Sequence, residues 1–562
     1  MSFSAHSLLL LPLLVFLFAA STPAQDRSQS RSMVVSRGGI VAAENPLAAQ
    51  AGAEILARGG NAADAAVAAN AAIGVIEPMM NGIGGDLFAI VYDAKSGKLY
   101  GLNASGWAPA ALTPEFLAKK GIHDMPQHGI HTVTVPGAVD GWSKLLSRFG
   151  SKKFSDVLAP AIHYARDGFP VAEWDAVYWA EAEPFLAQDN TLASTYLIHG
   201  HAPKVGEVFK NPGLARSLEL IAQNGRDGFY QGETASKILA FSSHLGGAMT
   251  ASDLAEFSSE WVDPISTTYR GWTVYEIPPN GQGIAALLML NIMETFSIAS
   301  LPDPADRFHI MIEAKKLAYA DLLRYIGDPR FSTIPVSGLL SKDYAAQRAK
   351  LIDMSKANCS VSPGEPEFPT AGDTTYLTVV DRDGNMVSLI QSNFDEFGSR
   401  LVAPGTGFAL QNRGALFNLD PNSPDVLAGR KRPLHTIIPA FMTNGDTRIA
   451  FGIMGGFNQA QAHAQFVSDI ADLGLNIQAA LEAPRFTKRT FPGCDVQIED
   501  RVPPSIRATL AIRGHLLDVR GPYSANMGGG QAVLRNFSTS VNFGASDPRK
   551  DGAAIPEPSP SH

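Results

Sequence analysis

Hydrophobic and polar positions near the start of the chain predict two consecutive helices. Asn45-Pro46 combines an N-cap with a proline at the first helical position, and apolar positions then recur on one face. Gly59-Gly60 ends this helix, and Asn61 with Asp64 three residues later can cap a second, alanine-rich helix. Because alanine side chains let helices approach closely, we expect this pair to be buried.

Two further segments have clear periodicity. The apolar run from Leu87 to Tyr92 predicts a strand that closes on a turn at Asp93 to Gly97. Phe308 to Tyr325 has helical periodicity and good helix formers, and Gly327-Asp-Pro329 ends this helix.

Two other segments lack such a pattern. Ala357 to Gly372 is rich in Pro, Gly, Ser, Glu and Thr, which predicts an exposed linker. The final stretch, residues 547–562, ends in Pro-Glu-Pro-Ser-Pro-Ser-His, and we expect it to be a disordered tail. Strong strand signals resume directly after the linker.

The N-terminus carries an apolar run of a different kind. Leu8 to Ala20 is interrupted by Pro12 and is short for a membrane span, but it suits the core of a signal peptide that is cleaved after Ala24. No Lys or Arg precedes it, so an uncleaved anchor or a buried helix is the alternative. We expect residues 1–24 to be a signal peptide. The mature protein is then secreted, periplasmic or extracellular, with no stable membrane span.

The strongest local signal is a hairpin that follows the linker. Thr375 to Val380 is a β-rich strand, Asp383-Gly384 is a strong turn signal, and Met386 to Ile390 is the return strand. A pair of threonines at the start of a strand can reflect β-propensity alone, and that is the simpler interpretation.

The register of this hairpin decides which side chains meet. If Asp383-Gly384 is a two-residue loop, Thr375 faces Ser392 and Thr374 faces Asn393, whereas a one-residue bulge puts Thr374 opposite Ser392. Either register brings a threonine hydroxyl at a strand end close to a serine hydroxyl.

Composition narrows the classes of function. The chain has 562 residues, 45% hydrophobic and 18% charged, which is ordinary for a globular protein with a large core. A net charge of −9 without a basic stripe argues against nucleic acid as a partner. The histidines and acids lack metal-ligand spacing, and Gly82-Ile-Gly-Gly lacks nucleotide-loop spacing, so we expect no metal and no cofactor. Cys359 and Cys494 leave one bridge or two free thiols as alternatives.

A series of motifs along the chain indicates that the hairpin has a function. In chain order they are Gly59-Gly-Asn-Ala-Ala-Asp-Ala-Ala66, Glu77-Pro78 with Asn81-Gly-Ile-Gly-Gly85, Val135-Pro-Gly-Ala-Val-Asp-Gly-Trp142, Glu313-Ala-Lys-Lys316 with Ala318-Tyr-Ala-Asp321, Gly327-Asp-Pro329, Thr374-Thr375 with Val379 to Asn385, Arg432-Pro-Leu434 and Met454-Gly-Gly456. From about Gly38 to about Asn542 this ordered set resembles the γ-glutamyltranspeptidases, which are N-terminal-nucleophile hydrolases.

The resemblance implies a mixed α/β (α+β) fold, a four-layer αββα sandwich around two packed antiparallel sheets. It also implies self-cleavage between Asp373 and Thr374. The large subunit would comprise residues 25–373 and the small subunit residues 374–562, built into one integrated fold as a heterodimer of the two fragments.

The chemistry of such a cut fits the local sequence. A threonine hydroxyl is a weak nucleophile and needs a base, and cleavage before Thr374 frees an α-amine on the same residue that can act as this base. In the resemblance, Ser392 matches the residue whose hydroxyl bonds the nucleophile. Gly455 and Gly456 match the backbone amides of the oxyanion hole. A simple turn after a strand is the alternative for these glycines.

The sequence departs from the family where the γ-glutamyl group is recognised. Ser105 stands where the glutathione-cleaving members have a carboxylate-binding arginine, and a serine hydroxyl does not replace that bidentate clamp. Leu416 and Phe394 replace the groups that hold the α-amine. His435 and Thr436 replace paired serines, and the segment from Asn418 to Lys431 is short for the usual lid.

Candidate replacements can be named from the sequence. We count Ser105, Asn393, His435 and Thr436 as candidate substrate-binding residues, with a packed structural histidine as the equal alternative for His435. Arg413, next to Asn412, could supply a cation near the pocket, but we expect an exposed loop arginine there.

Three functional hypotheses follow. The first is an autoprocessed γ-glutamyltranspeptidase-like hydrolase or acyltransferase with an acyl-enzyme on Thr374. The second keeps the enzyme class but has a different substrate, a short acyl amide other than glutathione, for example one that ends in a carboxylate. The chain resembles a subgroup of the family whose members include cephalosporin-acylase-like and oxamate-type amidohydrolases. The third is a secreted binding protein on an inactive scaffold. In the first two, the substrate is a small-molecule amide.

Overall fold

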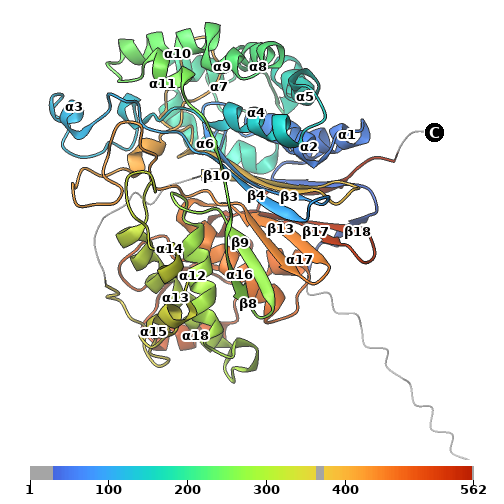
Figure 1. Ribbon diagram of the computed structural model, residues 1–562, viewed down its shortest axis with the longest axis vertical. Coiled ribbons are helices and arrows are strands. Elements are labelled where there is room, and N and C mark those ends of the chain that lie inside the picture. Colours follow the sequence, from blue (N-terminus) through green and yellow to red (C-terminus); the bar gives the residue numbers. More distant parts are fainter. Residues whose placement is uncertain (1–28, 363–372, 560–562) are drawn as a thin grey trace, which may run out of the picture.

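The computed structural model describes residues 29–362 and 373–559, and it contains two stacked seven-stranded sheets with antiparallel pairing throughout (Figure 1). Sheet I has the order β19 (Ala553–Pro556), β2 (Ile40–Ala43), β10 (Asp373–Val380), β11 (Met386–Phe394), β3 (Asp86–Asp93), β4 (Lys98–Ala104) and β7 (Glu260–Val262). Sheet II has the order β1 (Val34–Ser36), β18 (Val541–Ser546), β17 (Gly530–Asn536), β13 (Thr447–Ile453), β12 (Ala440–Asn444), β9 (Trp272–Glu276) and β8 (Ile265–Tyr269).

Helices cover the outer face of each sheet. Those that pack over sheet I are α1 (Pro46–Ala57), α2 (Ala62–Ile76), α4 (Ala138–Phe149), α5 (Phe154–Asp167), α6 (Glu173–Leu186), α7 (Asn190–Tyr196), α8 (Pro212–Asn224), α9 (Asp227–Tyr230), α10 (Gly232–His244) and α11 (Ala251–Ala255). Those that pack over sheet II are α12 (Gly283–Glu294), α13 (Pro304–Tyr325), α14 (Val336–Leu339), α15 (Lys342–Ala349), α16 (Gln459–Ala471), α17 (Ile477–Glu482) and α18 (Pro504–Ile512). The expected αββα sandwich is confirmed.

Smaller elements complete the fold. They are α3 (Pro114–Ala118), a two-stranded sheet of β5 (Phe169–Pro170) and β6 (Val208–Phe209), and a three-stranded sheet of β14 (Phe486–Thr487), β15 (Asp495–Glu499) and β16 (Leu516–Arg520). None of the helices in the described part of the chain is both long and apolar enough to cross a membrane. The predicted signal peptide, residues 1–24, lies outside the described residues.

Burial on both faces explains the continuous apolar run that becomes β3. Leu87, Ala89 and Val91 belong to the core under the helices, whereas Phe88 and Ile90 belong to the core between the two sheets. Strand side chains alternate between faces, so a strand covered on both sides has no polar face to present.

The N-terminal helix pair forms as predicted. Asn45 caps α1 with Pro46 at the first position, and Asn61 and Asp64 form a reciprocal capping box at α2. Every residue of α2 is buried. The Asp381 carboxylate accepts a hydrogen bond from the amide of Ala62 at 3.1 Å, so the hairpin turn is joined to the start of α2.

The register of the hairpin differs by one residue from the register that a two-residue loop would give, so that interpretation is wrong. Val380 pairs with Met386 and Thr375 pairs with Gln391. The reason is the side chain of Asp381, which accepts from the amides of Asp383 at 3.0 Å and Asn385 at 2.9 Å and so organises a longer turn.

The predicted disordered tail is also wrong for the part that the structure describes. Residues 553–556 form β19, an edge strand paired with β2. Upstream of it, Asp547 and Arg549 are buried and joined at 3.1 Å, and Arg549 also meets Glu499 at 2.8 Å. Polar composition suggested disorder, but these charges are matched by partners elsewhere in the chain. Residues 560–562 lie outside the described ranges.

Candidate active site

Thr374 lies at the start of β10, where a register shift falls between Asp373 and Thr375. Its Oγ1 donates to Ser392 Oγ across the hairpin at 3.3 Å. Ser392 Oγ in turn accepts from the amide of Phe394 at 2.8 Å. Thr374 and Ser392 are both buried. The structure therefore brings together the two hydroxyls that the sequence placed at the strand end.

Thr375 points to the other side of the strand, toward a pair of acids that sequence reasoning missed. Its Oγ1 lies 3.1 Å from Glu44 Oε2 and 3.3 Å from Glu77 Oε2. Burial, and then the carboxylates of Glu44 and Asp175, raise the pKa of Glu77 well above its usual value. Glu77-Pro was recognised only as a motif, because nothing in the spacing shows that the acid reaches the neighbour of Thr374.

Gly455 and Gly456 follow β13 in sheet II, opposite the hairpin. Their φ angles are 121° and 58°, a region that favours glycine. Gly452 packs so closely on the ring of Tyr376 that a Cβ there would meet it at 2.5 Å. This contact brings the segment that ends at Gly456 close to the strand that begins at Thr374. The nucleophile candidate comes from one sheet and the oxyanion-hole candidates come from the other.

A buried glutamine, Gln282, connects the segment at Thr436 with the segment at Gly456. Gln282 Nε2 donates to the carbonyl of Gly456 at 2.8 Å and to that of Thr436 at 2.5 Å. Tyr319, from the Ala318-Tyr-Ala-Asp321 motif, bonds Gln282 Oε1 at 3.0 Å. Segments that are far apart in sequence are therefore held in one orientation around Gly456.

Ser105 has its hydroxyl engaged within the protein. It donates to Asn103 Oδ1 at 2.7 Å, and Asn280 Nδ2 approaches it at 3.3 Å. Its carbonyl accepts from Arg432 Nε at 2.9 Å. Arg432 in turn forms an ion pair with Glu260 at 2.9 Å. Among the described residues, the cation that contacts Ser105 is Arg432, and Arg432 is already paired with Glu260.

His435 is fully buried between Asp86 and the ring of Phe88. Its Nδ1 accepts from the amide of Ile437, so Nε2 carries the proton that bonds Asp86 Oδ2 at 2.9 Å. Burial, and then the charge of Arg413, lower the pKa of His435 to about 4. These contacts favour the packed, neutral histidine over a substrate contact.

Asn393 and Thr436 take different positions. The side-chain Nδ2 of Asn393 donates to the carbonyl of Pro78 at 3.5 Å, and the backbone amide of Asn393 donates to the carbonyl of Met80 at 3.0 Å. It therefore contacts the Glu77-Pro segment. Thr436 is buried and its Oγ1 accepts from Arg413 Nη1 at 2.7 Å.

Arg413 is not the exposed loop residue that we expected. It begins a short 3-10 turn (Arg413–Leu416), and its side chain is fully buried against the ring of Phe394, with the guanidinium carbon 4.5 Å from the ring centroid. Burial lowers its pKa to about 10, and the nearby Asp86 and Asp395 oppose this shift. The guanidinium is therefore charged at neutral pH. Sequence pattern failed here because a short polar loop gives no sign that it folds inward.

Two cavities differ in their relation to these residues. One, of about 680 Å³, lies at the turn end of the hairpin beside Asp383 and Asn385, and Thr374 is not among its lining residues. A cleft of about 290 Å³ is lined by Met454, Gly455 and Asp395, among others. The smaller cleft is the one that adjoins the candidate oxyanion hole.

Cys359 and Cys494 form a disulfide, which settles the alternative that the sequence left open. Lys316, from the Glu313-Ala-Lys-Lys motif, lies beside this bridge and donates to the carbonyl of Asn358 at 2.6 Å. It also forms an ion pair with Glu313 at 2.5 Å. The motif thus fixes the segment that leads toward Asp373.

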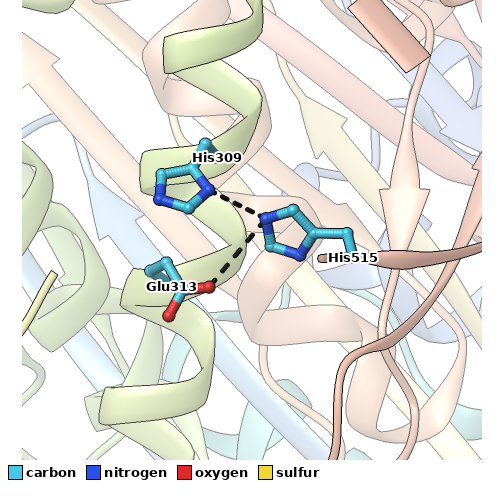
Figure 2. Close-up of side chains that lie close together, drawn as sticks. All are labelled: His309, Glu313 and His515. Carbon is cyan, nitrogen blue, oxygen red and sulfur yellow. Dashed lines mark hydrogen bonds and ion pairs between the residues drawn. The ribbon is translucent and has the colours of Figure 1, made fainter. Parts of the chain in front are cut away.

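One cluster in the described residues has the composition of a metal site (Figure 2). His309 and Glu313 lie one turn apart on α13 and face His515, which precedes β16. His309 Nε2 bonds the carbonyl of Asp353 at 2.9 Å and must carry its proton, so its Nδ1 accepts from His515 Nε2 at 2.8 Å. Lys316 pairs with Glu313 at 2.5 Å and the two imidazoles bond each other, so the cluster forms a structural network in which His515 Nδ1 has no hydrogen-bond partner among the described residues. This cluster does not stand out in the sequence, because His515 lies too far along the chain to be associated with His309 and Glu313.

Comparison with known proteins agrees with the fold. The γ-glutamyltranspeptidase family model matches residues 48–557. The glutathione hydrolase-like YwrD proenzyme of Bacillus subtilis (strain 168) is 38% identical over 530 residues, which cover 93% of this chain and 99% of that protein. The oxamate amidohydrolase proenzyme of Klebsiella pneumoniae is 36% identical over 531 residues, with 92% and 98% covered.

Solved structures give the same result. A cephalosporin acylase from Bacillus halodurans superposes with a TM-score of 0.88 at 44% sequence identity, over 96% of this chain and 99% of that one. The match extends over both sheets and both helical layers. The chain therefore belongs to the γ-glutamyltranspeptidase family and is an amide hydrolase or acyltransferase of the N-terminal-nucleophile type.

Proposed function

We propose that Thr374 is the nucleophile and that it forms an acyl-enzyme with the amide substrate. The observation that carries this assignment is the 3.3 Å contact between Thr374 Oγ1 and Ser392 Oγ. Gly455 and Gly456 follow β13, a strand of the other sheet that packs against β10 and β11. Ser392 orients the threonine hydroxyl. The backbone amides of the two glycines stabilise the negative charge that develops on the substrate oxygen.

Self-cleavage uses the same hydroxyl. Thr374 Oγ attacks the carbonyl carbon of Asp373, the C–N bond between the two residues breaks, and the hydroxyl proton moves to the departing nitrogen. Asp373 is then held as an ester on Thr374. Water hydrolyses this ester, which releases the Asp373 carboxylate and restores the hydroxyl. The products are a chain that ends at Asp373 and a chain that begins with the free amine of Thr374.

Turnover then needs no other base. The free α-amine, with a reference pKa of about 8, takes the proton from Thr374 Oγ as the oxygen attacks the substrate amide. That proton passes to the leaving amine as the C–N bond breaks. Water or an acceptor amine attacks the resulting ester in the same way and regenerates the enzyme.

The two fragments stay together as a heterodimer in this proposal. The small fragment would begin with β10, which pairs with β2 of the large fragment, and β11 pairs with β3. Sheet I is thus built from both fragments. Their separation would expose its central strands, which are buried on both faces.

We further propose that the donor is a short acyl amide other than a γ-glutamyl compound. The supporting observation is Ser105, whose hydroxyl is bound to Asn103 where the glutathione-cleaving members carry an arginine. Relatives of comparable similarity include the oxamate amidohydrolase proenzyme and an acylase proenzyme from Pseudomonas, 35% identical over 537 residues. The chain keeps the proposed catalytic residues but differs at the position that binds the γ-glutamyl group. This combination fits an enzyme that has kept its chemistry and changed its substrate.

The nucleophile and the donor are tested with one set of proteins. The wild type should separate into two fragments, the smaller beginning at Thr374, and should release p-nitroaniline faster from a glutaryl anilide than from a γ-glutamyl anilide. Thr374→Ala should remain one inactive chain. Thr378→Ala is the matched control, because its buried hydroxyl lies on the same strand but bonds the carbonyl of Val387 at 2.9 Å. A cut, active Thr374→Ala protein would reject the nucleophile assignment, and faster γ-glutamyl release would reject the donor.

We also propose that the protein is exported. The apolar run from Leu8 to Ala20 supports a signal peptide, and the Cys359–Cys494 disulfide suits an oxidising compartment. Expression of the full chain in a Gram-negative host followed by cell fractionation and N-terminal sequencing tests the idea. Recovery of the protein in the cytosol with residues 1–24 still attached would reject it.

A further inference from the structure

Arg413 is a buried cation with unused hydrogen-bonding capacity. Its Nη1 donates to Thr436 Oγ1, but Nε and Nη2 have no hydrogen-bond partner among the described residues. No carboxylate in residues 29–362 or 373–559 forms an ion pair with it, although the charges of Asp86 and Asp395 act on it. Burying a charge without a partner is costly, so a site that keeps one is expected to receive a ligand of opposite charge.

Asp86, the acid whose charge acts most strongly on Arg413, already accepts hydrogen bonds from other donors. Asp86 accepts from the amide of Gly106 at 2.7 Å, from Gln411 Nε2 at 2.8 Å and from His435 Nε2 at 2.9 Å. These three bonds hold its carboxylate in place. Asp86 therefore lowers the electrostatic cost of the buried arginine without binding it directly.

Two contacts tie Arg413 to the catalytic residues. On one side its guanidinium stacks on Phe394, whose amide donates to Ser392 Oγ, the partner of Thr374. On the other side it bonds Thr436, whose carbonyl shares Gln282 with that of Gly456. Arg413 thus lies between the nucleophile side and the oxyanion side of the site.

The backbone at Phe394 supports a functional role for this position. Its φ is 83°, which is unfavourable for a bulky aromatic residue and is retained only where the surroundings enforce it. In the uncut chain, Asp373 pairs with Phe394. In the proposed cut form the chain ends at Asp373, so this pairing, next to the residue whose ring carries the guanidinium, is no longer held by a continuous strand.

We propose that Arg413 binds a carboxylate at the far end of the substrate's acyl group, while the amide carbonyl lies at Thr374. The free Nε and Nη2 form one edge of the guanidinium, which matches the two oxygens of a carboxylate. The preferred substrates are then amides of short dicarboxylic acids. This inference rests on the proposed acyl-enzyme and names the residue and the charge that select the acyl group.

The test compares two anilides that differ in the terminal carboxylate: glutaryl p-nitroanilide and valeryl p-nitroanilide. Wild type should prefer the glutaryl compound by kcat/KM. In Arg413→Gln the ratio of the two kcat/KM values should fall about 100-fold, because a bidentate charge-assisted contact is lost. Arg413→Lys keeps the positive charge but lacks the paired N–H donors of the guanidinium. The ratio of the two kcat/KM values should therefore lie between those of Arg413→Gln and wild type. Completeness of self-cleavage, measured by intact mass, reports whether each variant folds.

Arg535→Gln is the matched control. Arg535 is also a buried arginine, but it lies in β17 and bonds Asn542 Oδ1 at 3.0 Å. Its loss should leave the substrate ratio unchanged. If Arg413→Gln fails to mature, inhibition of wild type decides: free glutarate should compete at least about 10-fold more strongly than valerate.

The outcomes separate this inference from the proposal on which it rests. An equal fall on both anilides in a self-cleaved Arg413→Gln protein, or equal inhibition by glutarate and valerate, overturns the carboxylate site. Absence of any acyl adduct on the Thr374 fragment overturns the acyl-enzyme itself. A preserved adduct with an altered ratio supports both.

Discussion

Cys359 and Cys494 are covalently joined across the proposed cleavage point, because Cys359 lies before Asp373 and Cys494 lies after Thr374. Self-cleavage therefore yields two peptides that remain linked by a disulfide in addition to their shared sheet.

This connectivity predicts the behaviour of the mature protein on a gel. Without reductant the self-cleaved wild type should run as one species, and with reductant it should separate into two. Cys494→Ser should give two species under both conditions. Separation of the unreduced wild type into two bands would contradict the pairing of these cysteines across the cut.

Ser392 should be required for efficient chemistry. Ser392→Ala removes the partner of Thr374 Oγ1 and should lower kcat about 100-fold and slow self-cleavage, because the hydroxyl loses its orientation. Time courses of fragment formation and anilide hydrolysis measure both effects.

Ser388→Ala is the matched control on the same strand. Ser388 is equally buried, but its hydroxyl bonds that of Tyr376 at 2.7 Å. Its removal should cost about 1 kcal/mol of stability and leave both reactions within a few-fold of wild type. Equal effects of the two substitutions would show that a buried strand serine, and not contact with Thr374, is what matters.

Gly455 should tolerate no side chain. At a φ of 121°, alanine is strained, and its methyl group would crowd Asn458 at 3.3 Å. Gly455→Ala should therefore turn the neighbouring amides away from the substrate and lower kcat at least about 100-fold.

A second glycine separates strain from catalysis. Gly445 in the turn between β12 and β13 has a φ of 50°, and the space that an alanine methyl group would occupy there is open. Gly445→Ala should lower stability by about 1 kcal/mol and leave kcat unchanged. If thermal denaturation shows equal destabilisation but only Gly455→Ala loses activity, backbone strain alone does not explain that loss.

His435 should make stability depend on pH in the acidic range. Its pKa is about 4 in the folded protein, against about 6.5 when unfolded, so unfolding takes up a proton between these values. Its contribution is fully present above pH 6.5 and is lost as pH falls toward 4, at about 1.4 kcal/mol per pH unit.

The difference between wild type and His435→Gln isolates this contribution. Both proteins are compared in the uncut Thr374→Ala background, so that unfolding involves one chain. The stability advantage of His435 should shrink between pH 6.5 and 4 and stay constant above pH 7. A constant difference across the whole range would mean that His435 has the same pKa in the folded and the unfolded protein.

Local interactions decided the parts of the structure that the sequence predicted best. The capping residues Asn45 and Asn61 act on amides within a few residues of themselves, and the α13 helix follows from its own periodicity. The meeting of Thr374 and Ser392 also follows from a short hairpin, and the ordered motifs identified the family. For these features the interacting groups are close in sequence, so their pattern is visible there.

Tertiary structure decided the features whose partners are distant. Asp381 set the hairpin register through its own turn and through α2, and Glu499 ordered the tail by pairing with Arg549. Arg413 became a buried cation because Phe394 and Thr436 enclose it. The free energy of a charged side chain depends on which groups surround it after folding, and no local pattern contains that information. The sequence by itself therefore determined the family and the nucleophile candidate, whereas packing decided that the charge of Arg413 is buried.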